Sequence, residues 1–206
     1  MSFSRLVLRL RTCRSGVSAV EFALALPFFL ALMGSGVEMA WLMMTNHKVL
    51  RLTTMTADLV ARDGASTSRL SESQIYDILS AMDVSAKPLD IRGRGRVIIS
   101  AVLGEDTNSD GAPDVNRIKW QRFDGGLTTA PRLIGCVTSS TVTAALDRQL
   151  RLAEPLFHAQ VSYTYQPIFA QKLVAWFNIP ATVTRTAAYR GRGAIFHPIL
   201  SVNGYP

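Results

Sequence analysis

A long apolar run near the N-terminus constrains this chain more than any other feature. Residues 22–44 are 23 consecutive positions with a single charged side chain, Glu38. In an α-helix this run would measure about 35 Å, and the hydrocarbon core of a bilayer is about 30 Å thick. The run therefore predicts a helix that spans a membrane.

Basic residues before the run indicate its orientation. Residues 1–16 contain no acidic side chain and four basic ones: Arg5, Arg9, Arg11 and Arg14. Because Lys and Arg are enriched on the cytoplasmic side of membrane helices, we expect the N-terminus in the cytoplasm and everything after residue 44 to be exported. The protein would then be a single-pass membrane protein with an exported C-terminal domain.

A cleaved secretory signal is the alternative, because it also combines a basic start with an apolar segment. The apolar segment of such a signal has only about 7 to 15 residues. Ser35 and Gly36 offer small residues for a cut, but Glu38 and the apolar residues 40–44 follow them. A membrane anchor accounts for the whole run better than a cleaved signal does.

Another carboxylate, Glu21, stands at the start of the apolar run, where a charge is costly and usually functional. It lies five residues after Gly16 and directly before Phe22. This combination of basic leader, glycine, spaced glutamate and aromatic residue resembles the TadE-like pseudopilins of the tight-adherence (Tad) pilus system, a branch of the type IV pilin superfamily. The resemblance is strongest over residues 14–62, and the stretch up to Pro27 shares it.

The resemblance implies processing and a role in assembly. In that family a prepilin peptidase cuts after the glycine, which here would separate Gly16 from Val17 and leave Glu21 and Phe22 at the fifth and sixth mature positions. The freed amine of Val17 would pair with the Glu21 carboxylate, within one chain or between neighbours. The implied function is assembly or initiation of a Tad or type IVb pilus, an adhesion structure built by machinery similar to type II secretion. The implied partners are the prepilin peptidase, other pilins and pseudopilins, inner-membrane pilus assembly proteins and the lipid bilayer.

Other interpretations stay open at this point. Glu21 is also explained as a carboxylate near the membrane interface, stabilised by the positive N-terminal end of its helix. A chain that keeps residues 1–16 would be an unprocessed, membrane-anchored periplasmic binding or structural protein. A chain cut as a secretory signal would release a secreted domain.

Length and charge limit what the exported part can be. The 206 residues allow a leader at 1–16, a transmembrane and stalk helix at 17–62 and a periplasmic domain at 63–206. The formal charge of +7 comes from 22 basic and 15 acidic residues, so without the four leader arginines the net charge is +3. This balance gives no support for a nucleic-acid partner. Arginine-glycine runs at 92–96 and 190–193 are interpreted as turns with exposed charge.

Local patterns predict an α+β domain that follows the long helix. Apolar spacing continues that helix to residue 62, for a length of about 69 Å. Its apolar positions are Val49, Leu52, Met55 or Thr56, and Leu59. A second helix begins at Ser71, where Gln74 completes a capping box. Its apolar stripe is Ile75, Ile78, Leu79 and Met82.

Alternation of apolar and polar residues then predicts strands. Residues 97–103 and 118–123 are expected to pair as a hairpin, and 157–166 and 182–189 to add two more strands. Because the predicted helices come before the predicted strands in the chain, we expect an α+β domain with an antiparallel sheet, as in pilins. In the third strand His158 and its polar neighbours are expected on a solvated face. A short helix is expected through Val142, Leu146 and Leu150.

The connection at residues 167–180 carries more apolar bulk than an exposed loop usually does. Its large apolar side chains are Ile168, Phe169, Leu173, Val174, Trp176 and Phe177. We favour the interpretation that it folds under the sheet as core. The alternative is a contact with a partner or with the membrane surface.

One loop offers oxygen ligands for calcium. Asp106, Asn108 and Asp110 alternate before Gly111, as in the first half of a calcium loop. Asp114 adds a fourth oxygen-bearing side chain. The twelfth position is Arg117 instead of the bidentate Glu of an EF-hand. A polar hairpin loop explains the segment without an ion, so calcium is a secondary hypothesis and no other cofactor is expected.

No catalytic motif stands out. The three histidines are scattered, and motifs such as HExxH, GxSxG and CxxC are absent from the sequence. Cys136 is the only cysteine after the leader. It is expected to be buried beside Ile134 and Val137, while a bridge to another chain or a free thiol stays open. We therefore expect a protein without enzymatic activity.

Overall fold

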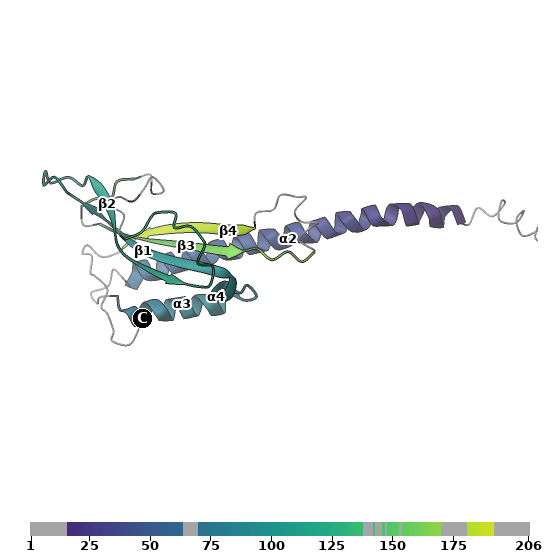
Figure 1. Cartoon of the computed structure of the whole chain (residues 1–206), viewed down its shortest axis with the longest axis horizontal. Coiled ribbons are helices and arrows are strands. Elements are labelled where there is room, and N and C mark those ends of the chain that lie inside the picture. The colour runs from purple at the N-terminus through teal and green to yellow at the C-terminus, as the bar shows by residue number, and fades with distance from the viewer. Residues whose placement is uncertain are drawn as a thin grey trace, which may run out of the picture. The chain divides into compact units, whose positions relative to one another are not determined.

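A computed structural model describes residues 16–63, 70–137, 142, 146, 148–152, 154–169 and 181–191 (Figure 1). The chain divides into two compact units. Among the described residues, the first unit holds 16–43 and 167–169, and the second holds the described parts of 44–166 together with 181–191. Helices come first and an antiparallel sheet follows, so the predicted α+β fold class is confirmed.

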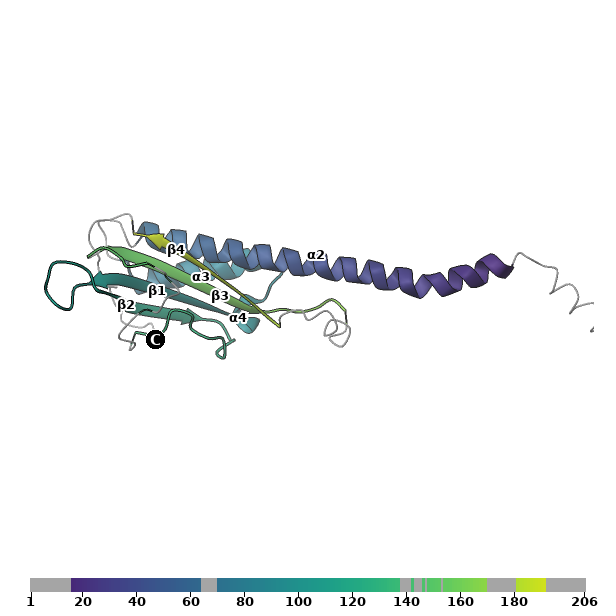
Figure 2. The same ribbon diagram turned by 90° about the horizontal axis from the view of Figure 1, so that it is seen from above.

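The long helix α2 runs from Val17–Asp63 and has 47 residues, as the sequence predicts. It contributes residues to both units. Pro27 lies inside it, where proline removes one main-chain hydrogen bond and bends a helix. Such a bend is visible in the first, purple part of α2 in Figure 2.

In the second unit, one face of α2 is buried. Its buried residues are Thr45, Val49, Leu52, Thr53, Thr56, Ala57, Val60 and Ala61. The hydroxyls of Thr53 and Thr56 donate to the carbonyls of Val49 and Leu52, at 2.7 Å and 2.8 Å. This local bonding satisfies hydroxyls that would be costly to bury alone. Of the two residues between which the pattern did not decide, Thr56 is in the buried stripe and Met55 is exposed.

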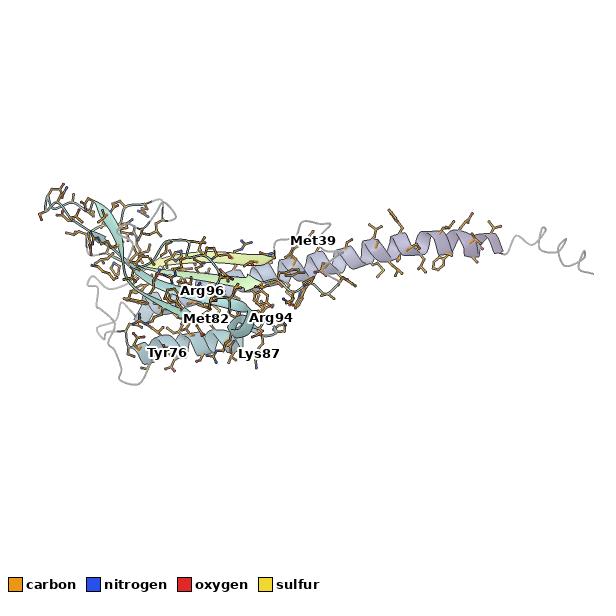
Figure 3. All side chains as sticks on the ribbon, in the orientation of Figure 1. Met39, Tyr76, Met82, Lys87, Arg94 and Arg96 are labelled. Atoms are coloured by element: carbon orange, nitrogen blue, oxygen red, sulfur yellow. The ribbon has the colours of Figure 1, made fainter. Side chains whose placement is uncertain are left out.

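The helix α3, Glu72–Ala86, begins as the sequence predicts. The hydroxyl of Ser71 accepts a hydrogen bond from the amide of Gln74, and the Gln74 side chain accepts one from the amide of Ser71. The four apolar residues of the expected stripe are all buried. The hydroxyl of Thr56 on α2 also contacts the sulfur of Met82, labelled on α3 in Figure 3, so the two helices are in contact within this unit. A short helix α4, Ile91–Arg94, follows.

Four strands form one antiparallel sheet in the order β2-β1-β3-β4. Their bounds are Gly95–Glu105 for β1, Val115–Asp124 for β2, Pro155–Thr164 for β3 and Thr182–Arg190 for β4. All four predicted strands are confirmed, and β1 and β2 pair as the predicted hairpin. A bulge between Ala101 and Val102 shifts the register of that pair.

One face of the sheet packs on the two long helices. Arg122 of β2 binds Glu72 of α3, and Arg185 of β4 donates to Asn46 of α2 at 2.7 Å. Residues in register with these two arginines share their face. The buried apolar ones are Val97, Ile99, Ala101, Trp120, Phe157, Ala159, Val161 and Val183. This face is the apolar core, and each of its fully buried large side chains contributes about 1.5–3 kcal/mol.

The other face of the sheet is covered by the chain between β2 and β3. Gln160 donates to the carbonyl of Pro131 at 2.6 Å and accepts from the amide of Leu133 at 3.0 Å. Gln121 donates to Ser100 and to the carbonyl of Gly135, each at 3.0 Å. Gln121, Ser100 and Gln160 of this face are thus bonded to protein instead of water.

A small apolar cluster completes this covered face. It consists of Val102, Ile118, Ile134, Leu150 and Leu156, with Val142 and Leu146 packed against it. The short helix expected through residues 142–150 falls largely outside the described residues, and Leu150 is not helical. Next to the cluster, a Cβ on Gly104 would lie 2.6 Å from the carbonyl oxygen of Arg151, so only glycine permits this close approach of the two main chains.

The expectation that β3 is half-buried is wrong. Every residue from Pro155 to Tyr163 is buried, including His158 at 4% exposure. The imidazole Nδ1 of His158 is buried and has no hydrogen-bond partner among the described residues, and this burial lowers its pKa to about 4. The alternation in the sequence was real, but it separates an apolar buried face from a polar buried face.

Candidate functional site

The start of α2 is apolar and exposed on all sides. Its large exposed side chains before Glu38 include Val17, Val20, Phe22, Leu24, Phe28, Phe29, Leu30, Leu32 and Met33. Figure 3 shows side chains standing out on both visible sides of this part of the helix. A helix that is apolar all round needs to be covered by other helices or by lipid. By length and composition, α2 is a helix able to cross a membrane.

The predicted processing and assembly residues lie together at the first turns of this helix. Gly16 directly precedes the first residue of α2, Val17. Glu21 and Phe22 follow one turn later, and all four are exposed. Residues four apart on a helix are neighbours on one face, so the main chain of Val17 and the carboxylate of Glu21 occupy the same side. This geometry permits the proposed pairing of a freed amine with that carboxylate.

The other carboxylate of the apolar run, Glu38, is buried at 4% exposure. Its Oε2 accepts hydrogen bonds from the main-chain amides of Ile168 and Phe169, at 3.0 Å and 3.1 Å. These partners lie 130 and 131 positions away in the sequence. Two amide donors offset part of the cost of removing a carboxylate from water.

Sequence reasoning did not assign Glu38 a role. The available signal was its position as the single charge in residues 22–44, since a charge in an apolar membrane segment usually has a specific partner. Which residue that partner is follows only from the fold. Glu38 is therefore a candidate functional residue that the structure adds.

The segment after β3 packs on the same part of α2. A Cβ built on Gly34 would lie 3.8 Å from the ring of Phe169, so that ring lies over the helix one turn before Glu38. Ile168 and Phe169 nevertheless remain 55% and 41% exposed. The favoured interpretation of this connection as core under the sheet is wrong for these two residues, because their amides bind Glu38 on the helix. Residues 170–180 lie outside the described residues.

The carboxylates of the loop between β1 and β2 accept hydrogen bonds from other groups of the same loop. Asp106 accepts hydrogen bonds from the amides of Asn108, Ser109 and Gly111. Asp110 binds the side chain of Asn108 and the amide of Ala112, and Asp114 binds the amide and hydroxyl of Thr107. Its hydrogen bonds with Thr107 lower the pKa of Asp114. Within the described part of the chain, no group of three His, Cys, Asp or Glu residues is placed to hold a metal. Calcium binding at this loop stays a prediction without a structural observation in its favour.

The arginine-glycine run at 92–96 is only partly exposed. Arg96 donates to the carbonyls of Thr128 and Ala130, at 2.5 Å and 2.8 Å. Its guanidinium also lies over the ring of Phe123, 5.2 Å from the centroid. Arg92 and Arg94 are exposed on α4. Arg96 of this run thus supports the β1–β2 hairpin from within. In the second run, Arg190 and Gly191 are described, and residues 192–193 lie outside the described residues.

Cys136 is half-buried and is not in a disulfide. Of its expected apolar neighbours, Ile134 is buried but Val137 is 48% exposed. The expectation that Cys136 is buried beside both residues is therefore wrong. Next to Cys136, Ile134 packs in the apolar cluster, whereas Val137 does not belong to it.

These features define a class: an α+β protein whose long N-terminal helix fits a single-pass membrane anchor. Residues 16–66 match the family model described as TadE-like protein. The chain is thus TadE-like over this segment, and the resemblance drawn from Gly16, Glu21 and Phe22 is confirmed. No curated protein and no solved structure matches the chain. The match supports a pilus protein of the Tad system and interaction with other pilus components.

Proposed function

We propose that the chain is a minor pilin or pseudopilin of the Tad type that takes part in the assembly or initiation of a Tad or type IVb pilus used in adhesion. A prepilin peptidase removes residues 1–16. The mature chain stays in the bacterial inner membrane through α2, with its N-terminus on the cytoplasmic side and its folded domain in the periplasm. From there α2 moves into a bundle with the helices of other pilins.

The observation that carries this proposal is the family match that begins at Gly16. The peptide bond after Gly16 lies at the exposed start of α2, where a protease can reach it. Beyond that bond, the helix exposes apolar side chains on every side. Lipid covers such a surface before assembly, and neighbouring pilin helices cover it afterwards.

Glu38 argues against release of a secreted domain. A signal peptidase cut after Gly36 would leave Glu38 near a frayed new N-terminus. In the structure Glu38 makes its hydrogen bonds to Ile168 and Phe169 from the interior of α2, not from a helix end. Retention of the whole helix keeps this contact. The proposed role is structural, with the peptidase, other pilins and inner-membrane assembly proteins as partners and without a catalytic activity.

Intact mass and N-terminal sequencing of the membrane-extracted protein test the processing step. Cells with an active prepilin peptidase are expected to yield a chain that begins at Val17, and cells without it a chain that keeps Met1. A chain that keeps Met1 in both cells would refute processing and support an unprocessed anchored protein. A chain that begins at any residue after Gly36 in both cells would support a secreted domain.

Substitution of Glu21 tests the assembly role separately. Glu21→Val removes the partner proposed for the Val17 amine, so we expect normal cleavage but loss of co-purification with other pilins and of surface pili. Glu21→Asp is the matched control, because it keeps the carboxylate near the same turn and retains part of the assembly. Normal piliation of Glu21→Val would refute the proposed pairing.

A further inference from the structure

The contact between Glu38 and the chain after β3 limits how far α2 can lie in a membrane. Pro167, Ile168 and Phe169 have neither helical nor strand hydrogen bonding. Two of their amides bind the Glu38 carboxylate. Irregular main chain that faces lipid does not occur inside the hydrocarbon region, because its other polar groups would have no partner there. Followed from its N-terminus, α2 therefore leaves the hydrocarbon core before it reaches Glu38.

This limit changes the expected membrane span. The apolar run 22–44 alone would place Glu38 six residues inside its end, a depth of about 9 Å. If the core ends before Glu38 and the span begins at Val17, it contains 21 residues. These measure about 32 Å, close to the roughly 30 Å of hydrocarbon that a bilayer offers.

The same limit moves Glu21 close to the opposite interface. Glu21 is four residues from Val17, which is about 6 Å along the helix. A carboxylate at that depth reaches the headgroup region more easily than one deeper in the span. Glu38 and Glu21 are then both placed near membrane boundaries. Neither has to be buried in the middle of the hydrocarbon.

We propose that Glu38, Ile168 and Phe169 form a membrane-interface contact that sets the depth of α2. In this contact Glu38 holds the main chain of the 167–169 segment at the headgroup boundary. The exposed side chains of Ile168 and Phe169 lie in the interfacial layer of the lipid. The spanning part of α2 is residues 17–37, and Met39 and Met43 lie outside the hydrocarbon.

The exposure of the two side chains supports lipid as the occupant of this surface. Phe169 rests on α2 over Gly34 and still leaves 41% of its surface free, and Ile168 leaves 55% free. Their surface continues the apolar surface of α2, which is exposed at Leu30 and Met33. Aromatic and aliphatic side chains gain free energy at the boundary between headgroups and acyl chains. A protein partner is the other occupant that the test below distinguishes.

Spin-label accessibility on the full chain in lipid nanodiscs tests the contact. Cys13→Ser and Cys136→Ser provide the background, and single cysteines are then placed at Leu30, Met33, Met39, Met43, Ile168 and Phe169. Collisions with oxygen report lipid, and collisions with a water-soluble nickel chelate report water. We expect oxygen to dominate at Leu30 and Met33, nickel to dominate at Met43, and Ile168 and Phe169 to show intermediate values. Val84 on α3, 68% exposed, provides the water reference.

Each other outcome refutes a specific statement. Oxygen-dominated collisions at Met43 would show that the span continues past Glu38 and would overturn the proposed boundary. Protection of Ile168 and Phe169 from both reagents would show that protein, such as a second copy, covers them. Nickel-dominated collisions at Leu30 would mean that α2 is not in the membrane, which refutes the anchor on which this inference rests.

Substitution of Glu38 tests its part in setting the depth. Glu38→Leu removes the acceptor, so the label at Phe169 should become nickel-accessible and the label at Met43 should shift toward oxygen. Glu38→Gln keeps one acceptor oxygen and should retain the pattern of the unsubstituted chain. Val37→Leu, at a half-exposed neighbouring position, is the control for a change of helix surface. An unchanged pattern in Glu38→Leu would refute the role of this carboxylate.

Discussion

The two compact units of this chain differ in whether the apolar side chains of α2 are exposed or buried. In the first unit, residues 17–37 of α2 expose most of their large apolar side chains. In the second unit, the helix from Val49 to Ala61 buries a stripe that includes Leu52 and Val60. The same continuous helix therefore begins as a surface that must be covered by other molecules and ends as part of a folded core.

The two units also differ in the kind of group that binds their buried carboxylate. Glu38 of the first unit binds two main-chain amides, so its partners do not depend on side-chain identity. Glu72 of the second unit binds the Arg122 guanidinium. The difference indicates that the second unit is stabilised by its own side chains, whereas the first is adapted to lipid and to neighbouring helices. Changes in the two units should affect different measurements.

We expect the largest difference between the two units when a leucine of α2 is replaced by aspartate in each of them. Leu52→Asp places a carboxylate in the core of the second unit, where Leu52 is 2% exposed. It should lower the free energy of unfolding by at least about 4 kcal/mol. Leu30→Asp should leave that domain folded and raise the cost of membrane insertion by about 2.5–3.5 kcal/mol. Urea unfolding in detergent and membrane fractionation measure the two effects.

Similar losses of folding in the two variants would contradict this division. It would mean that the start of α2 also stabilises the sheet. A Leu30→Asp chain that remains in the membrane fraction would instead indicate that protein, and not lipid, covers that part of the helix.

A pH effect should be confined to the second unit. Burial lowers the pKa of His158 to about 4, whereas an unfolded histidine has a pKa of about 6.5. As the pH falls from about 6.5 to about 4, the unfolded chain binds the proton first, and the folded domain loses up to about 3 kcal/mol. Above pH 6.5 both states are neutral at this residue and the effect is absent.

Urea midpoints between pH 7 and pH 4 measure this dependence. His158→Leu should flatten the profile, while His47→Leu, at an exposed position on α2, should leave it unchanged. A profile that His158→Leu does not alter would assign the acid sensitivity to other groups.

These differences show which features local sequence can predict. The capping box at Ser71, the end of the long helix and the four strands depend on residues near one another in the chain, so periodicity and capping rules found them. The burial of His158 depends on the loop that covers its face of the sheet. The alternation around it is the same whether water or protein lies there.

The residues of the candidate site also divide into those that local sequence predicts and those that only the fold reveals. Gly16, Glu21 and Phe22 form a short linear motif, and the family match over residues 16–66 confirms the resemblance drawn from it. The partners of Glu38 lie 130 positions away and are main-chain amides, which leave no mark in residue identity. A contact of this kind becomes visible only once the fold brings the two segments together.

The ion pair between α3 and β2 should have an intermediate effect. The hydrogen bonds of Arg122 with Glu72 raise the pKa of the guanidinium, which is about one-third exposed. Glu72→Ala leaves this cation without its partner and should destabilise the second unit by about 2 kcal/mol. Glu38→Ala should leave the unfolding midpoint of that unit unchanged. Equal losses in both variants would show that the two units unfold together.

The smallest effect is expected at the end of α2. Asp58 and Arg62 form a pair four residues apart, 2.6 Å between Oδ2 and Nη2, and Arg62 is 55% exposed. Pairs of this kind contribute about 0.3–0.5 kcal/mol, because water screens them and both side chains lose freedom. Asp58→Ala should therefore shift the urea midpoint by far less than Glu72→Ala, and high salt should remove the difference from the unsubstituted chain. A loss as large as that of Glu72→Ala would mean that Asp58 supports the buried face of α2, and the second unit would then depend on the helix surface as well as on its core.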